Sequence, residues 1–179
     1  MTRVAIQGIK GSYSEEAAIR LLGDAIDLVE CPSFEAAFRE AETNGMLAVI
    51  PVRNTIAGRI ESTSLLLAKS NFAVRDEIVL GIDHVLAGAT NTEFAAVRTV
   101  TSHPEALKQC SGFLAENPQI STAFGSDTAS SIRDVAAANG RDNAAIGSRR
   151  AAEMYGARVL RENVANAIDN RTTFYLIGK

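Results

Sequence analysis

The chain has 179 residues, of which 46% are hydrophobic and 22% are charged, and its formal net charge is -3. This composition predicts a soluble globular protein of one large domain or two small lobes. The longest apolar runs, at residues 47–51 and 64–68, are far shorter than the roughly 18 residues that cross a bilayer, and the Met-Thr-Arg start has no apolar signal region. We therefore expect a cytoplasmic protein with no membrane partner.

Composition also excludes several kinds of chemistry. Two cysteines, Cys31 and Cys110, cannot form a disulfide framework, and the histidines His84 and His103 do not show the spacing of metal ligands. Redox, zinc and haem chemistry are therefore not expected. Eighteen basic and 21 acidic residues give no general field for nucleic acid, so we expect no nucleic-acid partner.

Short apolar runs alternate with segments of helical period, which is typical of an α/β protein with a mostly parallel sheet. In chain order we predict strand 4–7, helix 14–22, strand 26–30, helix 34–42, strand 47–50, helix 62–68, strand 97–101, helix 104–115, strand 120–124, helix 128–138, strand 144–146, helix 149–155 and strand 174–177. Several helices are predicted to begin with a capping residue, namely Ser14, Ser33, Asp127 and Ser148.

Residues 72–89 break this alternation, because they read as extended chain with alternating apolar positions and no helix. They could form two strands that cross from one lobe to the other, and the last strand could return to the first lobe. We therefore expect two α/β lobes, residues 1–76 with 168–179 and residues 77–167, with a ligand in the cleft between them.

The segment from Gly8 to Ser14 follows the first strand directly and opens a helix. Gly8 and Gly11 allow a tight turn, and the hydroxyls of Ser12 and Ser14, with free N–H groups, could hold a carboxylate or phosphate. The spacing has neither the third glycine of a dinucleotide motif nor the Gly-Lys-Thr ending of a P-loop. Ordinary helix capping needs the same residues and is an equal alternative.

Four more junctions carry polar side chains beside a strand. Asn54 and Thr55 follow the strand at 47–50, where a capped loop is the favoured interpretation. His103 could orient a ligand or hold the strand-to-helix turn, and Cys110 is interpreted as a small buried residue rather than a nucleophile.

The last two junctions, residues 126–131 and 170–174, supply hydroxyl groups that capping would also explain. Five such junctions in one chain favour a shared site for a small organic acid.

In order and spacing, these motifs resemble the catalytic domain of prephenate dehydratases over essentially the whole chain. The matching elements are Gly-x-x-Gly-Ser-Tyr-Ser at 8–14, Ile50-Pro51 with Asn54, Thr55 and Gly58, Glu77-Ile78 to His84, His103-Pro104, Ala106-Leu107, Gln109-Cys110, Asp127-Thr128-Ala129, Tyr155-Gly156, and Asn170-x-Thr172-x-Phe174. The resemblance implies two α/β lobes like those of type II periplasmic binding proteins, with prephenate in the cleft.

The activity implied by the resemblance is the decarboxylating dehydration of prephenate to phenylpyruvate, a carbon-oxygen lyase step of phenylalanine biosynthesis. A family threonine that helps the ring hydroxyl leave corresponds to Thr172, and it must act through preorganised hydrogen bonding because a threonine hydroxyl is a poor acid. Asn54 and Thr55 complete the expected catalytic set. The expected substrate-binding residues are Gly11, Ser12, Tyr13, Arg53, Ser102, His103, Glu105, Asp127, Thr128 and Ala129. No metal or organic cofactor is implied, and we expect a homodimer.

Three positions depart from the family pattern: Arg53 replaces a glutamate, Glu105 a glutamine, and Thr173 the arginine of Thr-Arg-Phe. The first and third look like a relocation of charge, and our hypothesis is that Arg53, with Arg171, meets a substrate carboxylate or pairs with Glu105. An unpaired Glu105 would repel a dianion, so we expect it to have a cationic partner or to point away.

These departures keep other functions open: a prephenate decarboxylase, an arogenate dehydratase, or a small-acid-binding protein without activity. Bacterial members of the family usually carry a regulatory ACT domain after the Thr-Arg-Phe strand, whereas this sequence stops at Lys179. If this is the natural length, we expect a catalytic unit without phenylalanine feedback through its own chain.

Overall fold

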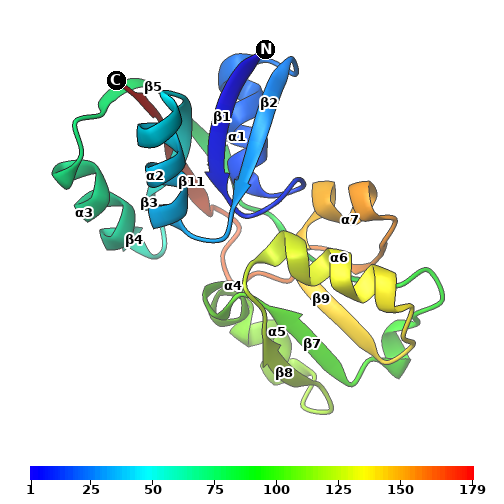
Figure 1. Cartoon of the computed structure of the whole chain (residues 1–179). Coiled ribbons are helices and arrows are strands. Elements are labelled where there is room, and N and C mark those ends of the chain that lie inside the picture. The colour runs from blue at the N-terminus through cyan, green and yellow to red at the C-terminus, as the bar shows by residue number, and fades with distance from the viewer. The chain divides into compact units, whose positions relative to one another are not determined.

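The computed structural model describes all 179 residues, which divide into two compact α/β units, Met1–Ile82 with Asp169–Lys179, and Asp83–Ile168 (Figure 1). The α/β class and the two-unit organisation agree with the sequence prediction. The boundary differs, because strand β5 (Ala73–Gly81) continues past residue 76 and pairs along its length with strand β11 (Arg171–Gly178). Residues 77–82 therefore belong to the first unit.

The first unit is a mixed sheet covered by helices on both faces. Its strand order is β2 (Ile26–Cys31), β1 (Thr2–Gln7), β3 (Leu47–Asn54), β11 and β5, and β4 (Gly58–Arg59) pairs with β3. The three strands β2, β1 and β3 are parallel, as predicted, whereas β11 runs antiparallel to both of its neighbours. The sheet is mixed because β11 enters from the far end of the chain rather than through a helical crossover.

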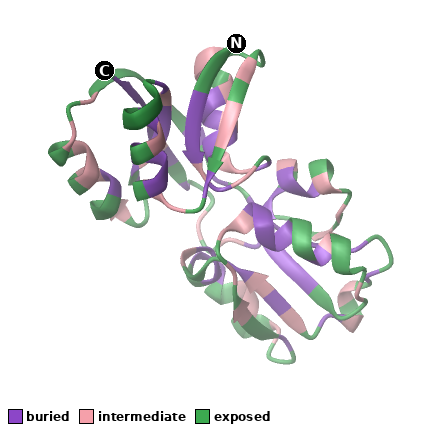
Figure 2. Ribbon diagram, viewed as in Figure 1, coloured by how far each residue is buried: buried purple, intermediate pink, exposed green.

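Two apolar clusters show which helices cover which face. Helix α1 (Tyr13–Leu22) packs with the cluster that holds Val49, Leu80 and Phe174. Helices α2 (Phe34–Asn44) and α3 (Glu61–Lys69) pack with the cluster that holds Ile50 and Ile177 on the other face. The central strands β1 and β3 consist mostly of buried residues (Figure 2).

The second unit has the strand order β10 (Arg158–Arg161), β6 (His84–Gly88), β9 (Asn143–Ser148), β7 (Thr99–Ser102) and β8 (Ser121–Phe124). Its helices are α4 (Pro104–Gln109), α5 (Ser111–Glu116), α6 (Thr128–Ala138) and α7 (Arg149–Tyr155), with a 3-10 turn at Phe94–Ala96. Strands β9, β7 and β8 are parallel, so their carboxyl ends lie at one edge of the sheet. At this edge β7 leads into α4, β8 into α6 and β9 into α7, so the N-termini of these helices lie there.

Some predicted elements need correction. The single helix expected at 104–115 is two short helices, because Cys110 leaves the helical conformation with φ -112° and ψ 18°. The cap of α1 is Ser12 rather than Ser14, whereas Ser33, Asp127 and Ser148 cap their helices as predicted. Strands β4 and β10 were not predicted. The model contains no helix that is both long enough and apolar enough to span a membrane.

Candidate active site

Asn54 and Thr172 lie directly opposite each other where β3 ends and β11 begins. Both side chains are buried, each with 7% of its surface exposed. The strand pairing slips by one residue beside them, since Thr173 lies opposite Arg53 whereas Phe174 lies opposite Pro51. The slip inserts one extra residue into β3, which has the form of a β-bulge.

The bulge decides which face of the sheet carries Asn54. In a regular strand Asn54 would share a face with Val52 and Ile50, because side chains alternate along a strand. After the inserted residue, Asn54 instead lies opposite Thr172 and on the same face as Phe174. This is the face covered by α1, so the two polar side chains meet on that side of the sheet.

The side-chain amide of Asn54 connects three acceptors. Its Nδ2 group donates to Thr172 Oγ1 at 2.9 Å, to Asn170 Oδ1 at 2.7 Å and to the carbonyl oxygen of Arg171 at 3.1 Å. Its Oδ1 atom accepts from the backbone N–H groups of Ile56 and Ala57, both at 2.9 Å. Because two backbone donors identify the oxygen, the other end of the amide must be the nitrogen.

This orientation determines the direction of the Thr172 hydroxyl. A threonine oxygen has one hydrogen to donate and two lone pairs to accept with. Since Asn54 donates to Thr172 Oγ1, the hydroxyl hydrogen of Thr172 is directed away from Asn54. The site thus presents a buried hydroxyl whose hydrogen can be donated to another group.

Thr55 holds the two strand ends together. Its N–H donates to the carbonyl of Arg171 at 2.9 Å, its hydroxyl oxygen accepts from the N–H of Arg171 at 2.9 Å, and its hydroxyl contacts the carbonyl of Asp169 at 3.3 Å. These contacts are all to the backbone. Thr55 therefore fixes the segment that carries Thr172.

The loop from Gly8 to Ser12 uses its N–H groups within the first unit. The N–H of Gly11 donates to the buried Glu15 carboxylate at 2.6 Å, and that of Lys10 donates to Glu30 at 2.7 Å. Ser12 accepts from the N–H of Glu15 at 3.2 Å and caps α1. The capping interpretation thus accounts for these groups, and two carboxylates already occupy the donors that were expected to bind an anion.

Two of the three positions that depart from the family pattern, 53 and 173, are cross-strand neighbours. Arg53 and Thr173 lie opposite each other, and Arg59 on β4 lies opposite Arg53 on its other side. This row is on the α2 and α3 face of the sheet, because Thr173 alternates with Thr172 along β11. The family's glutamate and arginine at positions 53 and 173 would form a direct cross-strand pair, so both substitutions change one pair.

Arg53 therefore points to the opposite face from Asn54 and Thr172. It is exposed and forms no ion pair within its unit, and Arg171 pairs with Asp169 at 2.7 Å. This arrangement does not support the hypothesis that Arg53 and Arg171 meet a substrate carboxylate. The charge of Arg53 instead lies on a solvated surface.

We expect Arg53→Ala to leave the KM for substrate within about twofold of the parent value, because an exposed charge of this kind contributes little. Arg59→Ala, its neighbour on the same face, is the matched control. Steady-state kinetics of both variants measure the effect. A KM that rises tenfold or more for Arg53→Ala but not for Arg59→Ala would show that Arg53 contacts the substrate.

In the second unit, Ser102 and His103 lie where β7 meets α4. The hydroxyl of Ser102 is fully buried and donates to the carbonyl of Ile146 on β9 at 2.7 Å. The exposed His103 caps α4, and its Nδ1 atom accepts from the N–H of Glu105 at 3.1 Å. His103 therefore holds the turn and carries its ring hydrogen on Nε2.

Glu105 has no ion-pair partner within its own unit and is half-buried. The expected cationic partner is therefore not found among the basic residues of that unit.

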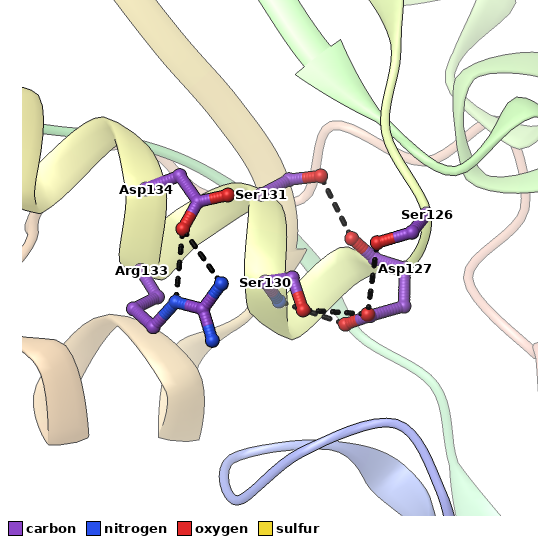
Figure 3. A network of polar contacts seen from close by, with 6 residues as sticks. All are labelled: Ser126, Asp127, Ser130, Ser131, Arg133 and Asp134. Carbon is purple, nitrogen blue, oxygen red and sulfur yellow. Dashed lines mark hydrogen bonds and ion pairs between the residues drawn. The ribbon is translucent and has the colours of Figure 1, made fainter. Parts of the chain in front are cut away.

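Asp127 caps α6, and all its contacts are with residues near it in the sequence (Figure 3). Its carboxylate accepts from the N–H of Ser130 at 2.7 Å and from the hydroxyls of Ser130 at 2.6 Å and Ser126 at 3.3 Å.

The Asp127 contacts make it an N-cap, and a negative cap stabilises a helix start by about 1 kcal/mol. Thr128 is half-buried at the first turn of α6, and Ala129 behind it is buried. Ser131 donates to the Asp127 carbonyl at 2.7 Å, while Arg133 and Asp134 pair with each other further along the helix (Figure 3). Asp127 thus positions Thr128 at the carboxyl edge of the sheet.

Two further polar residues had no assigned role in the sequence prediction. Asn170 is 2% exposed and contacts Asn54, as described above. Gln109 on α4 is also buried, and its Oε1 atom lies 3.0 Å from Nε2 of His84, which must carry the hydrogen. Both belong to the motifs quoted for the resemblance, but a contact with a residue distant in the sequence leaves no local pattern from which a role could be assigned.

Burial lowers the pKa of His84, although Gln109 and Asp83 oppose this shift. The unfolded chain therefore takes up a proton near the ordinary pKa of about 6.5 before the folded protein does, so His84 favours folding above that pH. We expect the free energy of unfolding to decrease as pH falls from about 7 to about 5. Denaturant titrations at each pH measure it, and His84→Gln should flatten the slope.

The other histidine provides the control for this prediction. His103→Gln makes the same substitution at an exposed position, and its slope is compared with that of His84→Gln. Equal slopes in the parent and in His84→Gln would contradict the assignment.

The cysteines agree with their interpretation as buried apolar residues. Burial raises the pKa of the Cys110 thiol to about 12, and the pKa of Cys31 is also raised, chiefly by burial. Neither forms the thiolate that a nucleophile needs near neutral pH. No group of three or more His, Cys, Asp or Glu side chains is arranged to hold a metal ion.

Both α/β units carry polar side chains and helix N-termini at the carboxyl edge of their parallel strands, which is the edge where open α/β sheets generally bind ligands. The prephenate dehydratase family model matches residues 4–179, and the chain belongs to this family.

The relatives agree. The chain is 35% identical over 182 residues to the bifunctional chorismate mutase/prephenate dehydratase of Enterobacter agglomerans, covering 99% of this chain and 47% of that protein. It is 34% identical over 178 residues to the chloroplastic arogenate dehydratase/prephenate dehydratase 1 of Arabidopsis thaliana, covering 99% and 45%. The chain thus spans about half the length of these relatives.

The fold is also found in a solved structure. The prephenate dehydratase of Arthrobacter aurescens in complex with L-Phe superposes with a TM-score of 0.89 at 23% identity, covering 99% of this chain and 60% of that chain. This likeness confirms the fold that the sequence resemblance implied.

Proposed function

We propose that this chain is a prephenate dehydratase domain that converts prephenate to phenylpyruvate. The ring carboxylate leaves as carbon dioxide, its bonding electrons enter the ring, and the ring hydroxyl leaves with its electron pair as hydroxide. One proton converts the hydroxide to water, so prephenate and a proton give phenylpyruvate, carbon dioxide and water. Formation of the aromatic ring drives the reaction, and the protein's task is to stabilise the leaving hydroxide.

The observation that carries this proposal is the Asn54-to-Thr172 hydrogen bond. It directs the Thr172 hydrogen away from Asn54, so that this buried hydroxyl can donate to the leaving hydroxyl. A fixed donor at a developing negative charge accelerates a reaction without a favourable pKa, because no reorganisation is needed as the charge forms. We assign Thr172 as the donor, Asn54 as the residue that aims it, and Thr55 as the support of the strand ends.

We propose substrate-binding residues in each of the two units. In the first unit these are Gly11, Ser12 and Tyr13, and in the second unit Ser102, His103, Glu105, Asp127, Thr128 and Ala129. The first N–H groups of α6, which precede that of Ser130, suit a carboxylate, because Asp127 caps the N–H of Ser130. Because Glu15 already occupies the N–H of Gly11, the first unit is expected to contact the ring hydroxyl more than the carboxylates.

Product analysis tests the proposal. Purified protein incubated with prephenate should release carbon dioxide and phenylpyruvate, both detectable by mass spectrometry. Because one relative carries arogenate dehydratase in its name, arogenate belongs in the same assay, where phenylalanine would be the product. A non-aromatic hydroxylated acid would identify a decarboxylase instead, and binding without turnover would overturn the enzymatic proposal.

We also propose a cytoplasmic homodimer that needs no cofactor. Light scattering during size-exclusion chromatography gives the mass in solution. Turnover that survives dialysis against a metal chelator would support the cofactor proposal, and a monomeric mass would contradict the proposed dimer.

A further inference from the structure

We infer that Asn170 is a positioning residue that sets the direction of the Thr172 hydroxyl through Asn54. This inference rests on the proposed function. Asn170 lies two residues before Thr172, is 2% exposed, and accepts from Asn54 Nδ2 through its Oδ1 atom at 2.7 Å. This is the shortest of the three contacts of Asn54 Nδ2.

The backbone around Asn170 is fixed from two directions. Its carbonyl accepts from the N–H of Ile82, which follows β5, at 2.8 Å. On either side of it, the backbone groups of Asp169 and Arg171 bond to Thr55. The position of Asn170 is therefore set by the neighbouring chain, so its side chain can hold Asn54 rather than follow it.

Asn170 restricts how the hydrogens of Asn54 are shared. An amide nitrogen has two hydrogens, and Asn54 Nδ2 faces three acceptors. When Asn170 Oδ1 takes one hydrogen, the second is aimed at Thr172 Oγ1 and the Arg171 carbonyl. Without Asn170 the oxygen of the Asn54 amide keeps its contacts to the N–H groups of Ile56 and Ala57, whereas the nitrogen loses one of its three acceptors, so the amide plane is held less firmly.

A freer Asn54 lets the Thr172 hydroxyl rotate, so its hydrogen is directed at the substrate for only part of the time. The substrate should still bind, because Asn170 is buried. We therefore expect Asn170→Ala to lower kcat about tenfold and to change KM less than twofold, since only the interaction made in the transition state is lost. Asn170→Asp keeps an acceptor oxygen for Asn54 and should recover most of the lost kcat.

A double-mutant cycle separates this role from a general structural one. If Asn170 acts through Asn54, then Asn170→Ala should change the rate of an Asn54→Ala protein less than twofold. The inference would be overturned if the two substitutions lowered the rate additively. It would also be overturned if Asn170→Ala lowered kcat, KM and the free energy of unfolding together. Asp169→Ala is the matched control, because its neighbouring exposed side chain pairs with Arg171 and does not contact Asn54.

A second measurement does not depend on turnover. In ¹⁵N NMR spectra of the substrate-free protein, the side-chain amide hydrogens of Asn54 should exchange with solvent at least tenfold faster in Asn170→Ala than in the parent. The backbone amides of Ile56 and Ala57 should be unchanged. Equal exchange rates of the Asn54 side-chain hydrogens in Asn170→Ala and in the parent would overturn the inference. Failure of the parent to turn over prephenate or arogenate would overturn only the proposed function.

Discussion

Replacing Thr172 by valine is expected to lower kcat by about 10²- to 10³-fold, the usual cost of removing one preorganised donor at a developing negative charge. Valine has nearly the shape of threonine but no hydrogen to donate. Asn54 Nδ2 would keep its contacts to Asn170 and to the carbonyl of Arg171. The free energy of unfolding should therefore fall by no more than about 1 to 2 kcal/mol.

Thr173→Val is the matched control for this variant. It makes the same chemical change one residue along β11, on the other face of the sheet and beside Arg53. Its kcat should stay within about twofold of the parent. Steady-state kinetics and thermal unfolding of both variants measure the two effects, and equal loss of activity in the two would show that the hydroxyl of Thr172 is not the donor.

The architecture could be predicted because it depends on local patterns. Strands β1, β2 and β3 are short apolar runs between helices of clear period, and capping by Ser33, Asp127 and Ser148 follows from residue type alone. The two successive extended segments, β5 and β6, could also be predicted, because alternation over a long stretch without a helix is a strong signal.

Elements that depend on the rest of the fold were missed. Strand β10 follows α7 as a four-residue edge strand, and its pairing with β6 is decided by position rather than by sequence. The break between α4 and α5 at Cys110 involves no proline or glycine at the break itself. The antiparallel direction of β11 was likewise not predicted, because a strand's direction depends on where the chain enters the sheet.

In the site, too, some features could be predicted from the sequence and others depend on the folded structure. Resemblance selected Asn54 and Thr172, but sequence spacing cannot show that a bulge turns Asn54 onto the face of Thr172. The same bulge places Arg53 on the other face, although it is the residue next to Asn54. Glu15 was missed and Asn170 was given no role, because their partners, a loop N–H and a distant amide, are defined only by the folded backbone.

Replacing Asn54 by aspartate is expected to lower kcat by about 100-fold, because the change reverses one hydrogen bond. Aspartate keeps an oxygen for the N–H groups of Ile56 and Ala57, but it places a second oxygen where Nδ2 now donates. Thr172 would then donate its hydrogen to the new carboxylate. The hydrogen that serves the leaving hydroxyl would be withdrawn without any change of shape.

The same variant should respond to pH in the direction opposite to an ordinary surface carboxylate. Burial against Asn170 Oδ1 and the Arg171 carbonyl would raise the pKa of the new carboxyl above its unfolded value of about 3.9. A raised pKa means that the folded state is favoured when the group is protonated, so stability and kcat should both recover as pH falls through that pKa. Asn91→Asp, the same change in an exposed turn, should be near neutral at every pH. Rate and unfolding measurements across the pH range of the folded protein test this, and a variant whose activity does not rise as pH falls would show that Asn54 does not aim Thr172.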